Sequence, residues 1–152
     1  MSAITVIGGN ASEDIAKRLA KKLKAKFVSS ELRTFPDGES KVTISGKPKG
    51  KIIVVNSTYP PVDTNLMQTL SLISKARQFS KNVVCAIPYM GYARQDREFL
   101  PGEIVTLSVI AKLLAAAGAS KVIVVDMHSM LGLRHFKIPI RNVSAVPELA
   151  NH

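Results

Sequence analysis

Residues 83–126 read VVCAIPYMGYARQDREFLPGEIVTLSVIAKLLAAAGASKVIVVD, and this stretch decides the fold class. Residues 83–87 form a short apolar run, which predicts a buried strand. Residues 105–117 carry the spacing of a helix and stop at Gly118, a residue type that commonly ends helices. Residues 122–126 form a second apolar run. A strand, a helix and a strand in this order predict a unit of parallel sheet.

The rest of the chain repeats this alternation of strands and helices. We therefore expect one α/β domain over residues 1–152, with a mainly parallel sheet and helices on both of its faces. Further strands are expected at residues 4–7, 27–28, 41–44, 52–56 and 138–143, the run 41–44 being an edge strand. One further helix, capped by Asn10 or Ser12, should carry Ile15, Leu19 and Leu23 at helical spacing, and another, starting at Asp63 or Thr64, should carry Leu66, Leu70, Ile73 and Arg77.

Composition narrows the function classes. The chain has 21 Lys+Arg against 11 Asp+Glu, a net charge of +10, which favours anionic partners such as nucleic acid or phosphorylated small molecules. It has no tryptophan, and no aromatic residues are interleaved with its lysines, so we expect no nucleic-acid partner. No apolar stretch is long enough to span a bilayer, so no membrane partner is expected. The single cysteine, Cys85, cannot build a disulfide framework, which favours the cytoplasm.

Ligands of parallel α/β sheets bind beyond the carboxyl ends of the strands, which directs attention to the segments after Ile87 and Asp126. The first of these segments, residues 88–98, reads PYMGYARQDRE. Its Arg94 and Arg97 can clamp phosphates, because a guanidinium forms forked hydrogen bonds to anionic oxygens. The alternative is a surface loop whose arginines pair with the neighbouring acids. Since long polar loops at this end of a sheet are usually functional, we favour the phosphate site.

The second segment contains Asp126-Met127-His128. Residues two apart on a strand point the same way, so Asp126 and His128 are expected to converge on one point. Histidine with a carboxylate is typical of a site for zinc or another transition ion. A structural hydrogen bond between the two side chains is the alternative. His135 and His152 have no obvious partners and are expected on the surface or in loops.

A third segment is Phe35-Pro36-Asp37-Gly38-Glu39. Pro-Asp-Gly is a common turn, and a purely structural turn is one interpretation. In the functional interpretation, Phe35 stacks on a flat ring, while Asp37 and Glu39 accept hydrogen bonds from a base or from ribose hydroxyls. The phosphate-binding motif Gly-x-x-x-x-Gly-Lys-Ser/Thr does not occur in the sequence, and neither does Gly-x-Gly-x-x-Gly.

Taken together, these segments resemble the N-terminal domain of the ribose-phosphate pyrophosphokinase family, also called phosphoribosyl pyrophosphate synthetases, with a pattern closest to archaeal members. Each motif is weak alone, but the run Tyr-Ala-Arg-Gln-Asp-Arg is highly specific in combination with the others. The matching positions are residues 35–39, 65–67, 88–97, 116–119 and 138–139, with Asp126 and His128.

The resemblance implies a phosphoribosyltransferase-like fold and a reaction that transfers the diphosphoryl group of ATP to ribose 5-phosphate. It implies Mg²⁺ as the metal, bound by His128. Asp126 lies beside His128, and we expect it to act on the metal through water. The resemblance also implies a homo-oligomer, because the segment at residues 35–39 serves the ATP site of a neighbouring subunit. The ATP-binding residues so implied are Phe35, Asp37, Gly38, Glu39, Arg94, Gln95 and Asp96.

Members of this family have a second, similar domain that supplies the loops for ribose 5-phosphate. Those loops have no counterpart in the present sequence, so we expect this chain to be the ATP-binding half and to be inactive alone, with no catalytic residue of its own. The main alternative is a non-catalytic relative that binds a nucleotide and regulates the enzyme.

Overall fold

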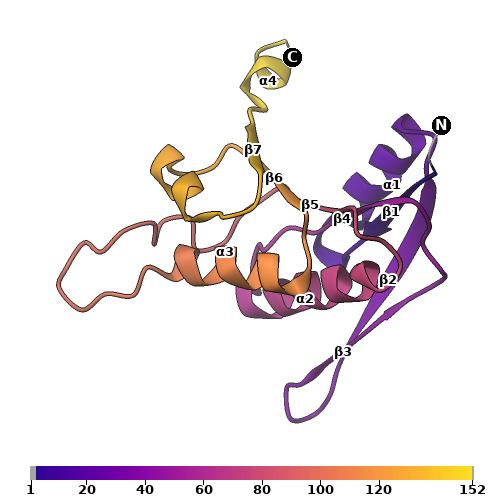
Figure 1. Ribbon diagram of the computed structural model, residues 1–152, viewed down its shortest axis with the longest axis horizontal. Coiled ribbons are helices and arrows are strands. Elements are labelled where there is room, and N and C mark those ends of the chain that lie inside the picture. Colours follow the sequence, from indigo (N-terminus) through magenta and orange to yellow (C-terminus); the bar gives the residue numbers. More distant parts are fainter. Residues whose placement is uncertain (1–2, 152) are drawn as a thin grey trace.

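The computed structural model describes residues 3–151, so His152 lies outside the described residues. In this part of the chain seven strands form one sheet in the order β3-β2-β1-β4-β5-β6-β7 (Figure 1). The β2–β3 pair is antiparallel, and every other neighbouring pair is parallel. The strands are β1 Ile4–Gly8, β2 Lys26–Thr34, β3 Ser40–Ile44, β4 Lys51–Val55, β5 Val83–Ile87, β6 Lys121–Val125 and β7 Ile140–Val143.

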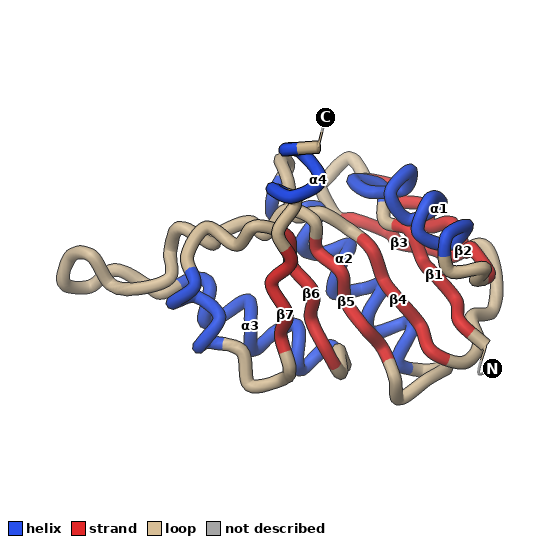
Figure 2. The backbone as a smooth tube through the Cα atoms, turned by 90° about the horizontal axis from the view of Figure 1, so that it is seen from above, coloured by secondary structure: helices blue, strands red, loops and turns tan. Residues whose placement is uncertain are grey.

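Helices cover both faces of the sheet, as expected from the sequence. Figure 2 shows α1 on one face, and α2 and α3 on the opposite face. The helices are α1 Glu13–Lys22, α2 Val62–Arg77, α3 Thr106–Ala117 and the short α4 Val146–Ala150, with the 3-10 helices η1 Asn10–Ser12 and η2 Met130–His135. Within residues 3–151, no helix has both the length and the apolar character needed to cross a bilayer.

The buried face of α1 differs from the one predicted. Ile15 and Leu23 are about 40% exposed, whereas Ala16 and Ala20 are buried. The helix lies very close to the sheet: a Cβ built on Gly8 of β1 would lie 3.0 Å from the Cβ of Ala16. Only small side chains fit at such an approach, so the two alanines face the sheet and the larger residues flank the contact.

The face that α2 turns to the sheet is also partly polar. Its buried residues include Asn65, Gln68 and Thr69, whereas the predicted Leu66 and Leu70 are only partly buried. The polar residues surround Asn56, which follows β4 and is fully buried. The Asn56 amide donates to the Thr69 hydroxyl at 3.0 Å and to the Asn65 carbonyl at 3.2 Å, so its burial is matched by hydrogen bonds.

The same network closes the crevice between β1 and β4, where the strand order reverses and where open α/β sheets often bind ligands. The Asn10 backbone amide donates to the Gln68 side-chain oxygen at 3.2 Å, and the Ala11 amide donates to the Asn56 side-chain oxygen at 3.2 Å. In a glycine-rich phosphate loop, these backbone amides would donate hydrogen bonds to a phosphate. Here they already donate to side-chain oxygens, so Gly8-Gly9-Asn10 is a structural turn.

Gly9→Ala is expected to destabilise the domain by about 1–3 kcal/mol, since overpacking a filled interior forces side chains out of place. A Cβ at Gly9 would lie 2.3 Å from the Cγ of Asn56, which its hydrogen bonds hold. Urea denaturation measures the loss. Gly46→Ala is the matched control, because its new methyl group would meet only the Lys26 amine, at 3.9 Å. Equal stabilities of the two variants would contradict this account of the crevice.

Candidate functional site

The carboxyl ends of β5 and β6 border a cavity of about 260 Å³. Arg94 reaches it from the loop after β5, and His128 reaches it from the segment after β6. The structure therefore brings together two residues that the sequence predicted from separate motifs. The described lining residues are Tyr89, Met90, Tyr92, Ala93, Arg94, Val125, Asp126, Met127 and His128.

A larger groove, of about 800 Å³, lies between β3, α2 and α3. Lys75 is the one charged side chain among its described lining residues, and the others are aliphatic or neutral polar. It lies beside β3, α2 and α3, and none of its described lining residues belongs to the carboxyl ends of β5 or β6. The smaller cavity therefore has the chemistry of a phosphate site, and the larger groove does not.

The loop after β5 presents Arg94 from a fixed backbone. The Gly91 amide donates to the Thr58 hydroxyl at 2.6 Å, and the Gln95 amide donates to the Tyr92 carbonyl at 2.9 Å. Tyr92 has a φ of 59°, a left-handed conformation that costs a non-glycine residue of order 1–3 kcal/mol. The Tyr92 hydroxyl donates to the Asp63 carboxylate on α2. Such an anchored turn leaves the Arg94 side chain exposed at the cavity.

Asp96 follows in the same loop and is buried, with 6% of its surface exposed. The pKa of its carboxyl is held below the usual range, first by a hydrogen bond from the Ser129 side chain and then by its own backbone amide and the charges of Arg97 and His128. Burial acts in the opposite direction. The Asp96 carbonyl oxygen bonds to the His135 Nε2 at 2.6 Å. His135, expected on the surface or in a loop, thus lies half-buried in η2 with a partner that the sequence did not reveal.

Asp126 does not follow the strand alternation that we used to pair it with His128. The strand β6 ends at Val125, and Asp126 has a φ of 43°, so its side chain leaves the direction of the strand. One carboxylate oxygen accepts from the Ser144 hydroxyl at 2.9 Å, and the other accepts from the Ala145 amide at 3.0 Å. Asp126 thus ties the end of β6 to the chain after β7, while still lining the cavity.

The number of metal-binding side chains around the cavity favours one class of metal ion over another. Among residues 3–151 no group of three or more His, Cys, Asp or Glu side chains gathers as a metal cage. A zinc site needs three or four such ligands, so the transition-metal expectation does not fit this donor set. Mg²⁺ fits better, because it needs only one or two protein contacts when phosphate oxygens and waters complete its shell. His128 and Asp126 are the described lining residues of the cavity whose side chains could contact such an ion.

The segment at residues 35–39 forms the tip of the β2–β3 hairpin, which projects from the sheet (Figure 1). The Phe35 amide donates to the Glu39 carbonyl at 2.8 Å, and the Asp37 carboxylate accepts from the Glu39 amide at 3.1 Å. Gly38 has a φ of 89°, which only glycine adopts readily. All five residues of the tip are exposed, and none of them lines the cavity. The structure therefore does not bring this segment to Arg94 and His128 within one chain.

The phenol of Tyr92 should titrate above its ordinary value. Its pKa is raised from 10.0, first by the hydrogen bond to Asp63 and then by burial and the Asp63 charge, all of which favour the protonated phenol. Any stability from this contact is present at neutral pH and is lost as pH rises through the raised pKa. The ultraviolet absorbance of phenolate, compared with that of Tyr92→Phe, measures the shift. Asp63→Ala should lower the pKa of Tyr92 towards its ordinary value, and an unchanged titration would contradict the contact.

The chain is similar in sequence and in fold to proteins of one family. A family model described as the N-terminal domain of ribose phosphate pyrophosphokinase matches residues 4–118. The chain is 38% identical to the ribose-phosphate pyrophosphokinase of Methanothermobacter thermautotrophicus over 97% of its own length and 52% of that protein. It is also 38% identical to the enzyme of the same name from Methanobrevibacter smithii, over 97% of this chain and 50% of the relative.

A solved structure supports the same assignment. The crystal structure of phosphoribosylpyrophosphate synthetase from Mycobacterium smegmatis superposes with a TM-score of 0.89 at 26% identity, covering 98% of this chain and 51% of that one. The chain thus spans about half the length of the relatives that it matches. Because the family model covers most of the chain and the fold agrees, the chain belongs to the ribose-phosphate pyrophosphokinase family and corresponds to its N-terminal domain.

Proposed function

We propose that this chain binds ATP with Mg²⁺ and forms the ATP-holding half of a ribose-phosphate diphosphokinase. The observation that carries the proposal is the shared cavity of Arg94 and His128 at the ends of β5 and β6. An arginine beside a metal-binding histidine suits a polyphosphate that carries its own metal ion. The single cysteine, Cys85, is buried and free, which supports the cytoplasmic location proposed for the protein.

In this proposal each residue has a separate task. Arg94 forms forked hydrogen bonds to phosphate oxygens, and Gln95 supports them through its side-chain amide. His128 contacts the Mg²⁺ bound to the phosphates, and Asp126 reaches the same ion through water. Mg²⁺ supplies charge neutralisation when it is bound.

The size of the cavity indicates which part of ATP it holds. Its volume of about 260 Å³ lies below the range of roughly 300–1,000 Å³ typical of sites that enclose a whole ligand. We therefore assign it to the phosphates. The base and ribose need a second surface, and the exposed segment at residues 35–39 of a second copy of the chain would supply one, with Phe35 against the base. This assignment makes the functional form a homo-oligomer.

The reaction proposed for the complete protein joins ATP to ribose 5-phosphate. The anomeric hydroxyl oxygen of the sugar attacks the β-phosphorus and loses its proton. The bond from that phosphorus to the oxygen bridging the α-phosphate breaks, and AMP leaves with this oxygen. Residues of this chain contribute by positioning the phosphates and neutralising their charge, which is the main work of phosphoryl-transfer sites.

The experiment that tests the proposal follows binding and chemistry separately. We expect the chain to bind Mg-ATP in a calorimetric titration, and to release no AMP when ribose 5-phosphate is added. Failure to bind ATP under any metal condition would contradict the proposal. AMP release at an ordinary kinase rate that depends on ribose 5-phosphate would contradict the division of labour between two halves.

A non-catalytic, nucleotide-binding regulatory relative is the second candidate, because the cavity that holds Arg94 and His128 would serve it equally well. Both candidates use the same cavity, so ATP binding does not separate them. Adding the C-terminal half of a related enzyme does separate them. The enzyme proposal expects activity to appear, and the regulatory proposal expects none.

A further inference from the structure

The turn that follows β5 is held by Thr58, a residue of the segment after β4. Thr58 is buried, with 2% of its surface exposed. Its backbone amide donates to the Tyr89 carbonyl at 2.9 Å, and its hydroxyl donates to the same carbonyl at 3.1 Å. The hydroxyl also accepts from the Gly91 amide at 2.6 Å. One side chain therefore bonds to the backbone on both sides of Met90, just after β5 ends.

The turn also packs closely against the segment after β4. A Cβ built on Gly91 would lie 2.8 Å from the Thr58 carbonyl oxygen and 2.8 Å from the Cγ1 of Val62. The rings of Tyr59 and Tyr89 meet edge to face, with their centres 6.2 Å apart. The close packing leaves the turn little freedom to move towards β4, and the Thr58 hydroxyl prevents it from moving away.

This arrangement bears on Arg94, although Thr58 does not reach the cavity. Arg94 lines the cavity, whereas Thr58 is not among the described lining residues. Arg94 lies three positions after Gly91, and a hydrogen bond from the Gln95 amide to the Tyr92 carbonyl at 2.9 Å closes the turn between them. A displacement at Gly91 is therefore passed to Arg94 through a short, closed piece of backbone.

We propose that Thr58 is a positioning residue, whose hydroxyl fixes the turn that presents Arg94 at the cavity, and which does not itself contact the nucleotide. An arginine held in place in the free protein loses less freedom when a phosphate binds, and this strengthens binding. The inference rests on the proposed function where ATP is concerned. The fixing of the turn is a property of the ligand-free protein, and it can be measured without ATP.

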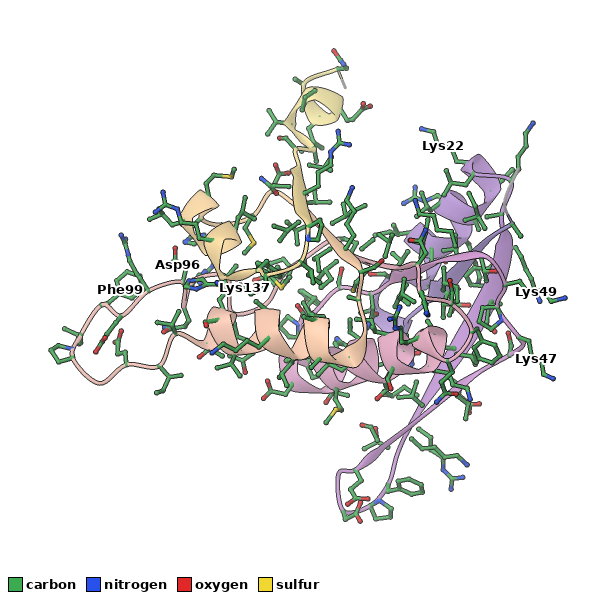
Figure 3. All side chains as sticks on the ribbon, in the orientation of Figure 1. Lys22, Lys47, Lys49, Asp96, Phe99 and Lys137 are labelled. Carbon is green, nitrogen blue, oxygen red and sulfur yellow. The ribbon has the colours of Figure 1, made fainter. Side chains whose placement is uncertain are left out.

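Thr5 provides a matched control, because it makes a similar pair of hydrogen bonds elsewhere. Its hydroxyl donates to the Lys49 carbonyl at 2.9 Å and accepts from the Lys49 amide at 3.0 Å, and 1% of its surface is exposed. Figure 3 shows Lys49 at the opposite end of the molecule from Asp96, which lies in the loop with Arg94. Loss of either buried hydroxyl should destabilise the domain, but only the loss at Thr58 should weaken ATP binding.

Three substitutions test the role by calorimetric titration. Thr58→Val keeps the shape of the side chain and removes the hydroxyl, so it should lower Mg-ATP affinity by about tenfold, the scale seen when groups that orient a ligand-binding side chain are removed. The loss should be the same with and without Mg²⁺, because Arg94 contacts the phosphates and not the metal. Thr58→Ser keeps the hydroxyl and should retain the affinity of the unaltered chain, and so should Thr5→Val.

Two further measurements follow the connection from Thr58 to Arg94. In the ligand-free protein, Thr58→Val should speed amide hydrogen exchange in residues 91–95, whereas Thr5→Val should speed it at Lys49 and leave residues 91–95 unchanged. In Mg-ATP titrations, the losses caused by Thr58→Val and Arg94→Ala should not add, because a displaced Arg94 no longer contributes.

The outcomes are distinct. If Thr58→Val binds Mg-ATP as tightly as the unaltered chain, if Thr5→Val loses as much affinity, or if the losses of Thr58→Val and Arg94→Ala add, the inference is wrong. If Thr58→Val fails to fold, Thr58→Ala and Thr5→Ala, which carry smaller side chains, decide the question in the same way. If the unaltered chain binds no ATP, the proposed function fails. Faster exchange of residues 91–95 in Thr58→Val would then still support the fixing of the turn, and unchanged exchange would overturn it.

Discussion

Arg94→Lys is expected to weaken Mg-ATP binding by about 1–3 kcal/mol, the usual scale of a hydrogen bond to a charged group. The positive charge is kept, but a planar fork that matches two phosphate oxygens becomes a single point charge. The side chain is exposed at the mouth of the cavity, so the melting temperature of the ligand-free domain should hardly change. Calorimetric titration measures the affinity.

Arg97→Lys is the control for this experiment. Arg97 lies in the same loop, but its guanidinium lies 4.8 Å from the centre of the Phe99 ring, and Arg97 does not line the cavity. We expect the affinity of Arg97→Lys for Mg-ATP to match that of the unaltered chain. Equal losses in both variants would show that ATP responds to the general charge of the loop, which would contradict a forked contact by Arg94.

Mixing two defective variants is expected to restore ATP binding. Phe35→Ala removes the surface proposed for the base, and Arg94→Ala removes the phosphate contact, so each variant alone should bind poorly. In a mixed dimer, one site combines the intact hairpin tip of one chain with the intact cavity of the other. About one quarter of all sites should then bind normally, since half of randomly formed dimers are mixed and each has one unaltered site.

The restored fraction is read from the stoichiometry of a calorimetric titration after the two variants exchange subunits. Mixing Phe35→Ala with a Phe35→Ala, Arg94→Ala double variant is the control, since no combination of those chains yields an intact site. If the first mixture restores nothing although mixed dimers form, the hairpin tip does not act on a neighbouring subunit. The base would then need a different binding surface.

The sequence predicted the central unit of the fold well. The apolar runs became β5 and β6, and Gly118, with a φ of 109°, ends α3 where expected. These elements follow from local periodicity, which the chain shows clearly. The exposed hydrophobic residues of α1 misled the prediction, because spacing alone does not reveal that a close approach to β1 selects Ala16 and Ala20.

Buried polar residues escaped prediction for a different reason. Asn65, Gln68 and Thr69 look like the solvent face of a helix until Asn56 is placed beside them, and that placement depends on the packed sheet. The 3-10 helix η2 also went unpredicted, although Ser129 is a typical capping residue and its side chain accepts from the Leu131 amide. A single turn of this kind has no periodic signal.

For the candidate site, motifs at two strand ends were enough to direct attention to the loop that carries Arg94 and to the segment that carries His128. The roles of their neighbours were not accessible in the same way. The partners of Asp96 lie more than thirty residues further along the chain, and those of Asp126 come after another strand. A hydrogen bond between such distant residues leaves no spacing pattern in a single sequence.

In the proposed site, the cavity binds the phosphates of ATP through a metal ion held by His128. The most direct test is a calorimetric titration of ATP with and without Mg²⁺, on the unaltered chain and on His128→Ala. We predict that Mg²⁺ strengthens binding to the unaltered chain, and that His128→Ala loses this gain while it keeps its metal-free affinity and its melting temperature. If His128→Ala instead unfolds the domain or leaves the Mg²⁺-dependent gain intact, His128 does not hold the metal, and the account of the site is contradicted.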